Sequence, residues 1–251
     1  MIGIVPDRGD WSSDAAYVTP DANGEAQGGV GTDRLIGDDG HMYLPKLLQE
    51  DDLEAIHRWI RDASFATLVT TGTDGAPQAS HLPFLLDASR GPFGVLRAHM
   101  ARANPQWQRL EACQVLVIFQ GPHGYISPRW YGSGESVPTW NYIAVHAYGQ
   151  PRLLDSGEAE AAVRDLVTTF EGDSQEAWRM DGLSERYIEG MLKGIVAFEI
   201  PIDRVEAKAK LSQNRPADVT GVIAGLRDVG DADSNRLATA MEDARTRSAQ
   251  A

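Results

Sequence analysis

Residues 65–87 read FATLVTTGTDGAPQASHLPFLLD, and this stretch indicates the fold class. FATLVTT combines β-branched and apolar residues, which favour a strand, and TDG is typical of a tight turn. APQASHLPFLLD then returns as a second strand. The sequence therefore predicts an antiparallel hairpin here.

A helix is predicted immediately before the hairpin, ending near Asp62. It begins behind a candidate N-cap at Asp51 or Asp52. Its apolar residues fall on one helical face, and they are Leu53, Ile56, Trp59 and Ile60.

Strands and helices also follow the hairpin. Apolar runs and alternating patterns predict strands at 94–100, 115–119, 124–131, 139–149, 194–202 and 204–212. Caps and helical periodicity predict helices at 105–112, 158–171, 184–192, 217–227 and 233–247. Short antiparallel strands with helices between and after them favour an α+β, mainly β fold, built on a closed or partly closed antiparallel barrel.

The first 41 residues differ from the rest of the chain. They are rich in Gly, Asp, Ser and Ala, and their few large apolar residues follow no period of 2 or 3.6. Such a segment cannot offset the entropy of ordering, so we expect a disordered tail at 1–41. One barrel domain at 42–230 and a C-terminal helix and tail at 231–251 complete the expected organisation. Patterned sequence begins at Met42, which makes it an alternative to Met1 as the start of translation.

Charge and composition limit the possible partners. The formal net charge is −13, and residues 1–41 contribute eight acids and two arginines to it. Because nucleic acids are bound through Lys and Arg, direct DNA binding has little support. The chain has no apolar run near the roughly 20 residues of a membrane span and no signal sequence in its first thirty residues, so we expect a cytoplasmic protein without membrane contact. The one cysteine, Cys113, fits a reducing compartment.

Polar and aromatic residues are concentrated at the ends of the predicted strands. Buried strands do not need such side chains, because an unpaired buried polar group costs about 1–3 kcal/mol. Ligand binding or a subunit interface explains them better. The segments are ASHLPF (79–84), RAHMARANPQW (97–107), GPHGYISPRWY (121–131), VPTWNYIAVHAYG (137–149) and KAKLSQNR (208–215).

The order and spacing of MYLP, FATLV, SHLPF, HMARANPQW, FQGPHGYISPRWY, VPTWNYIAVHAYG and KAKLSQNR resemble the PaiB family of FMN-binding negative transcriptional regulators, over residues 42 to about 226. The chain departs from the usual family pattern at Ala98, Gly124 and Arg129, where Gly, Ala and Ser are common, and this bears on the shape of the pocket. The resemblance implies an FMN-binding split β-barrel that forms a homodimer with the flavin between its subunits.

A cationic segment is the leading candidate for the FMN phosphate. Three arginines, one histidine and no acid lie between Arg97 and Arg109. Arg102 precedes a predicted helix N-terminus at Asn104, where free N–H groups favour an anion, so we expect Arg102 and Asn104 beside the phosphate. A solvated surface arginine is the alternative for Arg102. His99 is either a flavin contact or a core histidine.

Two strand segments offer contacts for the rest of the flavin. Ser80 and His81 precede Pro83, which suggests an edge position, and they could bond the flavin ring or the ribityl chain. Trp140 and Asn141 could supply a stacking surface and an amide partner. Core packing is the alternative for His81 and for Trp140.

The end of the last predicted strand supplies a further set of donors. Lys210, Gln213 and Asn214 suit a phosphate or a pyrimidine edge contributed from a second subunit, or else form a surface loop. The histidines lack the spacing of a metal site, so we expect no metal. The sequence identifies no catalytic residue.

Three functions remain open at this point. The first is a regulator whose FMN occupancy or redox state alters gene expression, through a partner or a small molecule more readily than through DNA. The second is a flavin-dependent oxidoreductase acting on a small molecule. The third is a haem-binding split barrel, in which His81 or His99 would be the axial ligand.

Overall fold

The computed structural model of the chain describes residues 41–132 and 134–250, and the side chains as far as Arg247. Residues 42–251 form one compact unit. The disordered tail expected at 1–41 lies, apart from His41, outside the described residues. No helix in the described part of the chain is both long and apolar enough to span a membrane.

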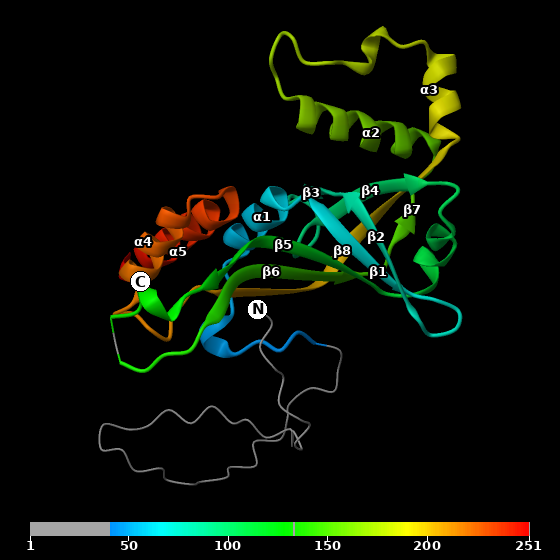
Figure 1. The fold of residues 1–251 in the computed structure, drawn as a ribbon. Helices are drawn as coiled ribbons and strands as arrows, with labels where there is room; N and C mark the ends of the chain where they lie inside the picture. The colour runs from blue at the N-terminus through cyan, green and yellow to red at the C-terminus, as the bar shows by residue number, and fades with distance from the viewer. Residues whose placement is uncertain (1–40, 133, 251) are drawn as a thin grey trace, which may run out of the picture. The chain divides into compact units, whose positions relative to one another are not determined.

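The unit is built from eight strands and several helices (Figure 1). The strands are β1 (Phe65–Thr71), β2 (Pro77–Pro83), β3 (Leu85–Asp87), β4 (Val95–Ala101), β5 (Val115–Ile126), β6 (Thr139–Gly149), β7 (Arg152–Leu153) and β8 (Ile195–Lys210). The α-helices are α1 (Leu53–Asp62), α2 (Ser156–Glu171), α3 (Glu185–Leu192), α4 (Val219–Val229) and α5 (Ala232–Gln250). Short 3₁₀ helices are η1 (Lys46–Leu48), η2 (Pro105–Ala112), η3 (Pro128–Trp130) and η4 (Met180–Gly182).

The strands form an antiparallel sheet in the order β2-β1-β5-β6-β8-β4-β3, with β7 added beside β8. Strand β8 belongs to both halves of this sheet. Its residues 202–210 pair with β6, and its residues 195–201 pair with β4. Among the described strands, β2 at one end of the order pairs only with β1, and β3 at the other end pairs only with β4, so the barrel is split and not closed. The predicted fold class is therefore confirmed.

Strand β8 is one element where the sequence predicts two. The 16-residue strand continues through residues 201–203, where the register with β6 shifts. Gly149 permits this crossing, because a Cβ at that position would lie 2.1 Å from the carbonyl oxygen of Pro201. The predicted helix at 105–112 is present as a 3₁₀ helix, with the Asn104 side chain accepting from the amide of Gln106.

The helices α1, α4 and α5 pack on the core side of the sheet. Asp52 caps α1, as expected, by accepting from the amide of Glu54 at 3.0 Å. The apolar face of α5 joins the same core as the barrel through three buried residues, Leu237, Ala238 and Met241.

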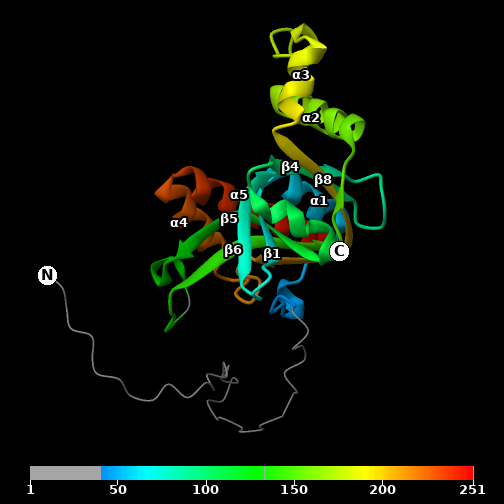
Figure 2. The ribbon, with the colours of Figure 1, turned by 90° about the vertical axis from the view of Figure 1, so that its right-hand side faces the viewer.

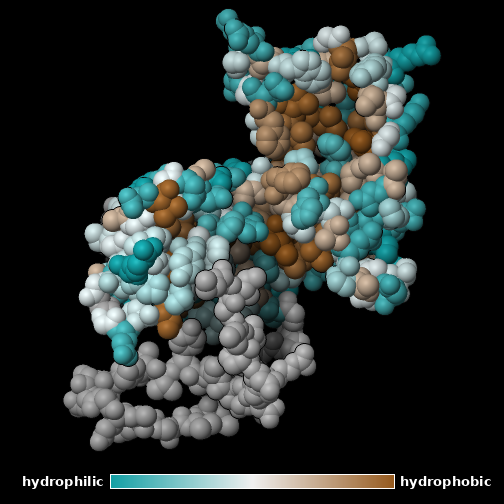
Figure 3. Space-filling model, in the orientation of Figure 1, coloured by the Kyte–Doolittle hydropathy of each residue, from teal (hydrophilic) through white to brown (hydrophobic). Residues whose placement is uncertain are grey.

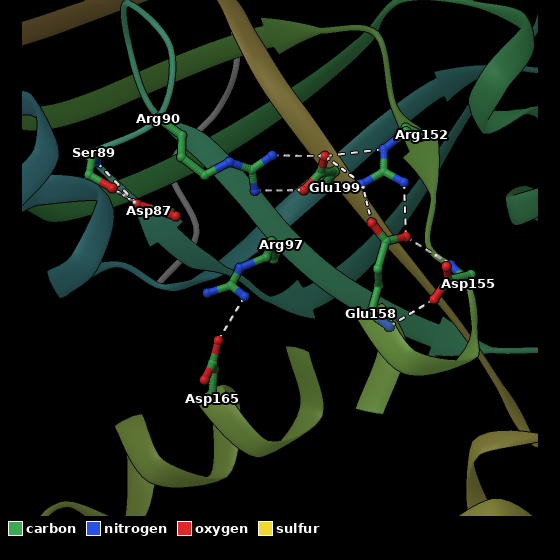
Figure 4. Close-up of polar contacts among 9 residues, drawn as sticks. All are labelled: Asp87, Ser89, Arg90, Arg97, Arg152, Asp155, Glu158, Asp165 and Glu199. Carbon is green, nitrogen blue, oxygen red and sulfur yellow. Dashed lines mark hydrogen bonds and ion pairs between the residues drawn. The ribbon is translucent and has the colours of Figure 1, made fainter. Parts of the chain in front are cut away.

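A pair of helices projects from the barrel between β7 and β8 (Figures 1 and 2). We call residues 156–193, which contain α2, η4 and α3, the arm. Its base is fixed to the barrel by a group of charged side chains (Figure 4). Arg97 of β4 donates to Asp165 of α2 at 2.7 Å, and Arg152 pairs with both Glu158 of α2 and Glu199 of β8.

Candidate functional site

One face of the five-stranded part of the sheet is turned away from the core. Along β6, Asn141, Ile143, Val145 and Ala147 are buried in the core, and the residues between them lie on the opposite face. The strand register places the same alternation on β2, β1, β5 and β8. We call this the outer sheet face, and its residues include Thr67, Val69, His81, Leu116, Ile118, Gln120, His123, Tyr125, Trp140, Tyr142, Ala144, His146, Tyr148, Arg204, Glu206, Lys208 and Lys210.

Aromatic and cationic side chains meet at one end of the outer sheet face. Trp140 is 54% exposed, and its ring stacks on His123 with centroids 6.2 Å apart. Lys210 lies opposite Tyr142 in the register and donates to the hydroxyl of Thr139. Burial lowers the pKa of Lys210. A half-buried ammonium group beside aromatic rings suits an anionic, planar ligand.

An incompletely bonded histidine lies further along the same face. Nδ1 of His146 is buried and has no hydrogen-bond partner among the described residues. Burial lowers the pKa of His146, so its imidazole is neutral near pH 7. Its register partner Glu206 accepts from the hydroxyl of Tyr148 at 3.4 Å, and burial raises the pKa of Tyr148. Since buried polar atoms are normally bonded, Nδ1 is a position that a ligand atom or a water molecule can occupy.

The predicted residues Ser80, His81 and Asn104 lie at the edge formed by β2. Nδ2 of Asn104 donates to the Ser80 hydroxyl at 2.9 Å, which joins the start of η2 to the edge strand. His81 lies on the outer sheet face, where its Nδ1 is 3.0 Å from the hydroxyl of Thr67. The side chain of Asn104 is therefore held by two bonds within the chain, whereas His81 faces outward.

Arg102 lies at the base of the arm. Its Nε donates to the carbonyl of Lys193 at 2.9 Å, and its Nη2 donates to the carbonyl of Ile195 at 2.7 Å. The guanidinium also lies 5.8 Å from the ring centroid of Trp107. In the described part of the chain Nη1 has no partner, so one edge of this exposed cation remains open to a ligand.

The other predicted residues are spread over the barrel. Asn141 is fully buried and donates to the Ser212 hydroxyl at 2.8 Å, on the core side of β6. Gln213 accepts from the amide of Leu211 at 2.7 Å, and Asn214 is exposed in the loop after β8. His99 is half-buried on β4, and burial lowers its pKa.

One chain thus does not bring the predicted residues together. His81, Trp140 and Lys210 share the outer sheet face, whereas Arg102 lies at the arm and Asn141 faces the core. Sequence reasoning missed His146, Tyr142 and Lys208, which lie on the same face. The alternation along residues 139–149 was the signal that could have identified them.

Comparison with solved structures agrees with this architecture. The flavocytochrome Anf3 from Azotobacter vinelandii is 17% identical, with a TM-score of 0.53 over 69% of this chain and 74% of that one. An FAD and heme binding protein from Mycobacterium smegmatis is 17% identical, with a TM-score of 0.50 over 64% and 73%. At these identities the likeness shows the fold alone. Residues 42–204 match the family described as "Putative FMN-binding domain". Fold and family together define the chain as an FMN-binding split-barrel protein.

Two relatives narrow the assignment further. The "Protease synthase and sporulation protein PAI 2" of Bacillus subtilis is 40% identical over 204 residues, covering 80% of this chain and 97% of that protein. The uncharacterized protein AN0679 of Emericella nidulans is 34% identical over 230 residues, covering 75% and 92%. The chain belongs to the PaiB family, which confirms the resemblance and the FMN assignment.

The side chains present fit this cofactor. FMN combines a phosphate, a polar chain and a planar ring whose edge both donates and accepts hydrogen bonds. The outer sheet face offers a cation at Lys210, an aromatic surface at Trp140, and imidazoles at His81 and His146. Arg102 offers a second cation at the base of the arm. The unbonded Nδ1 of His146 supplies the kind of open polar atom that a ring edge would satisfy.

Proposed function

We propose that two copies of the chain form a homodimer through the outer sheet face and bind FMN between them. The observation that supports this most strongly is the composition of that face. Apolar residues such as Val69, Leu116 and Ile118 lie there beside a neutral histidine with an open nitrogen and two lysines. A surface that combines apolar and aromatic side chains in this way is typical of a subunit interface.

The homodimer also explains why the predicted contacts are dispersed in one chain. His81, Trp140 and His146 would contact the ring from one subunit, with Arg102 next to the phosphate. Lys210, Gln213 and Asn214 would approach from the second subunit. Ser80 and Asn104 would position the edge strand, because they bond to each other. His99 and Asn141 would act indirectly, by fixing the packing of β4 and β6.

The proposed role of the holoprotein is regulatory. FMN occupancy or redox state would change how the dimer engages a partner in the cytoplasm, in keeping with the family's name. Direct binding to DNA is the weaker form of this proposal, because the chain carries 36 acids against 23 lysines and arginines.

A flavin-dependent oxidoreductase is the second candidate. The specific observation in its favour is the neutral His146 near Tyr148 on the outer sheet face, with a centroid distance of 6.3 Å. Bound FMN would supply the transfer of hydride or electrons, and His146 would exchange a proton with a substrate through Nδ1.

The absorption spectrum and the mass of the purified protein test the proposal. Two bands typical of oxidised flavin, together with a dimer in sedimentation at micromolar protein, are expected after addition of FMN. A monomer both with and without FMN would refute the proposed interface. A Soret band in the absorption spectrum would show that the protein binds haem in place of FMN. Oxidation of a reduced nicotinamide by the loaded protein would favour the oxidoreductase.

A further inference from the structure

The arm carries an apolar stripe that extends beyond the barrel. Along α2 the stripe begins with Ala159 and Ala162, which are buried at the base of the arm. It continues one and two turns later through Leu166 and Val167, which are half-buried, to Phe170, which is 55% exposed. An amphipathic helix normally keeps its apolar stripe against one surface, so the distal half of α2 lacks the surface that its sequence requires.

Other parts of the arm also expose large apolar side chains. Trp178, Tyr187 and Met191 are 49%, 55% and 59% exposed. Figure 3 shows apolar side chains gathered on the arm and also over the strands below it, on one side of the molecule. The chain therefore presents two separate apolar surfaces toward the same side.

The two surfaces have opposite charge. The arm contains nine acidic and four basic residues. The outer sheet face carries three basic residues and one acid, and that acid, Glu206, is paired with Arg204. Lys208 is only 7% exposed and donates to the carbonyl of Tyr43 at 2.8 Å. Lys210 is half-buried, and among the described residues no carboxylate lies within ion-pair distance of it, so it gives this end of the face a positive charge in a strongly acidic protein. Opposite potentials of this kind favour association and fix its orientation.

We propose that the arm of each subunit packs on the outer sheet face of a second copy, so that both arms contribute to the dimer interface. This inference rests on the homodimer proposed above and names the segment that holds it together. A two-fold axis allows both contacts at once, because the same rotation places the arm of each subunit on the outer sheet face of the other. The interface then closes, and no uncovered copy of either surface remains to extend a fibre.

Zero-length carbodiimide coupling of lysines to carboxylates tests the contact directly. Full-length ¹⁴N and ¹⁵N protein is mixed with FMN, allowed to exchange and coupled. Mixed-isotope products that join Lys210 to an arm carboxylate, such as Glu171 or Glu176, are expected. If the protein sediments as a dimer but such products are absent or carry a single isotope, the arm does not contact the second copy and the proposal is overturned. A monomer under all conditions would instead refute the homodimer itself.

Substitution gives an independent measurement. The double variant Phe170→Ser with Met191→Ser should raise the dimer dissociation constant by at least about tenfold, because each buried large apolar side chain contributes that much or more. Val229→Ser is the matched control, since Val229 is 54% exposed at the end of α4 and lies on neither surface. Equal dissociation constants for the double variant, the control and the unchanged protein would show that the arm stays free for another protein, and would overturn the inference.

Discussion

Glu199 accepts a hydrogen bond of 2.8 Å from Arg152, although only 5% of the Glu199 surface is exposed. The same carboxylate accepts two bonds from Arg90, and Arg152 also pairs with Glu158 in the capping box of α2 (Figure 4). Hydrogen bonds from Arg90, opposed by burial, lower the pKa of Glu199. One buried carboxylate thus connects β8, β7, the loop after β3 and the base of the arm.

Glu199→Gln should destabilise the protein at pH 7 by about 1.5–3 kcal/mol, the range for hydrogen bonds to charged groups. Because the folded-state pKa of Glu199 is depressed, its contribution is present above the unfolded pKa near 4.3 and is lost as pH falls through the lower folded value. The difference from the unchanged protein should therefore shrink between pH 5 and pH 3. Urea unfolding measures it. Glu160→Gln, which removes an exposed ion pair with Arg164, is the control and should cost no more than about 0.5 kcal/mol.

Gly149→Ala tests the crossing of β6 and β8. The added Cβ would lie 2.1 Å from the carbonyl oxygen of Pro201, so the two strands must separate, and we expect a loss of at least about 2 kcal/mol in thermal unfolding. Gly190→Ala is the matched control, because α3 has open space at that position. Removing a helical glycine there should stabilise the protein by about 0.5–1 kcal/mol. Equal changes in stability from both substitutions would contradict the close approach of β6 and β8 at Gly149.

Local signals in the sequence predicted most of the elements but not their pairing. Asp52, Asn104 and the glycines bounding strands act on neighbours in the chain, so the starts of α1 and η2 were predictable. The union of two predicted strands into β8 was not, because it depends on β6 and β4 as partners. Arg102 was placed beside a helix N-terminus, but its hydrogen bonds reach carbonyls about ninety residues away. The outer sheet face could not be predicted either, because α1 and α5 determine which face of each strand the helices cover.

His146 should make stability depend on pH near neutrality. Its pKa is lowered by burial, so the folded state resists protonation and the unfolded state, with a pKa near 6.5, does not. Stability is therefore expected to fall as pH drops from 7 to 5, by at most about 1.4 kcal/mol per pH unit for one proton. His146→Gln should reduce this slope in urea unfolding. Since burial also lowers the pKa of His99, part of the slope should remain. An unchanged slope would show that His146 is hydrated in solution.

Arg102→Ala tests the proposed phosphate contact. Removing a hydrogen bond to a charged group should weaken FMN by about 1.5–3 kcal/mol, or roughly ten- to more than a hundredfold. Flavin fluorescence measures the dissociation constant. Arg109→Ala is the matched control, because Arg109 also donates to a main-chain carbonyl, that of Thr71 at 3.1 Å, and lies in the same cationic segment. It should leave the affinity for FMN nearly unchanged.

Riboflavin separates a phosphate contact from a structural role for Arg102. It has the same ring as FMN and no phosphate, so Arg102→Ala should barely alter its binding, and the preference for FMN over riboflavin should shrink by the factor lost for FMN. The variant also removes the bonds to Lys193 and Ile195 that hold the base of the arm. If the substitution lowers the affinities for FMN and riboflavin equally, those bonds are the whole contribution of Arg102, and the phosphate site lies instead at Lys210 or Arg215. If neither ligand weakens, the open edge of Arg102 faces only solvent.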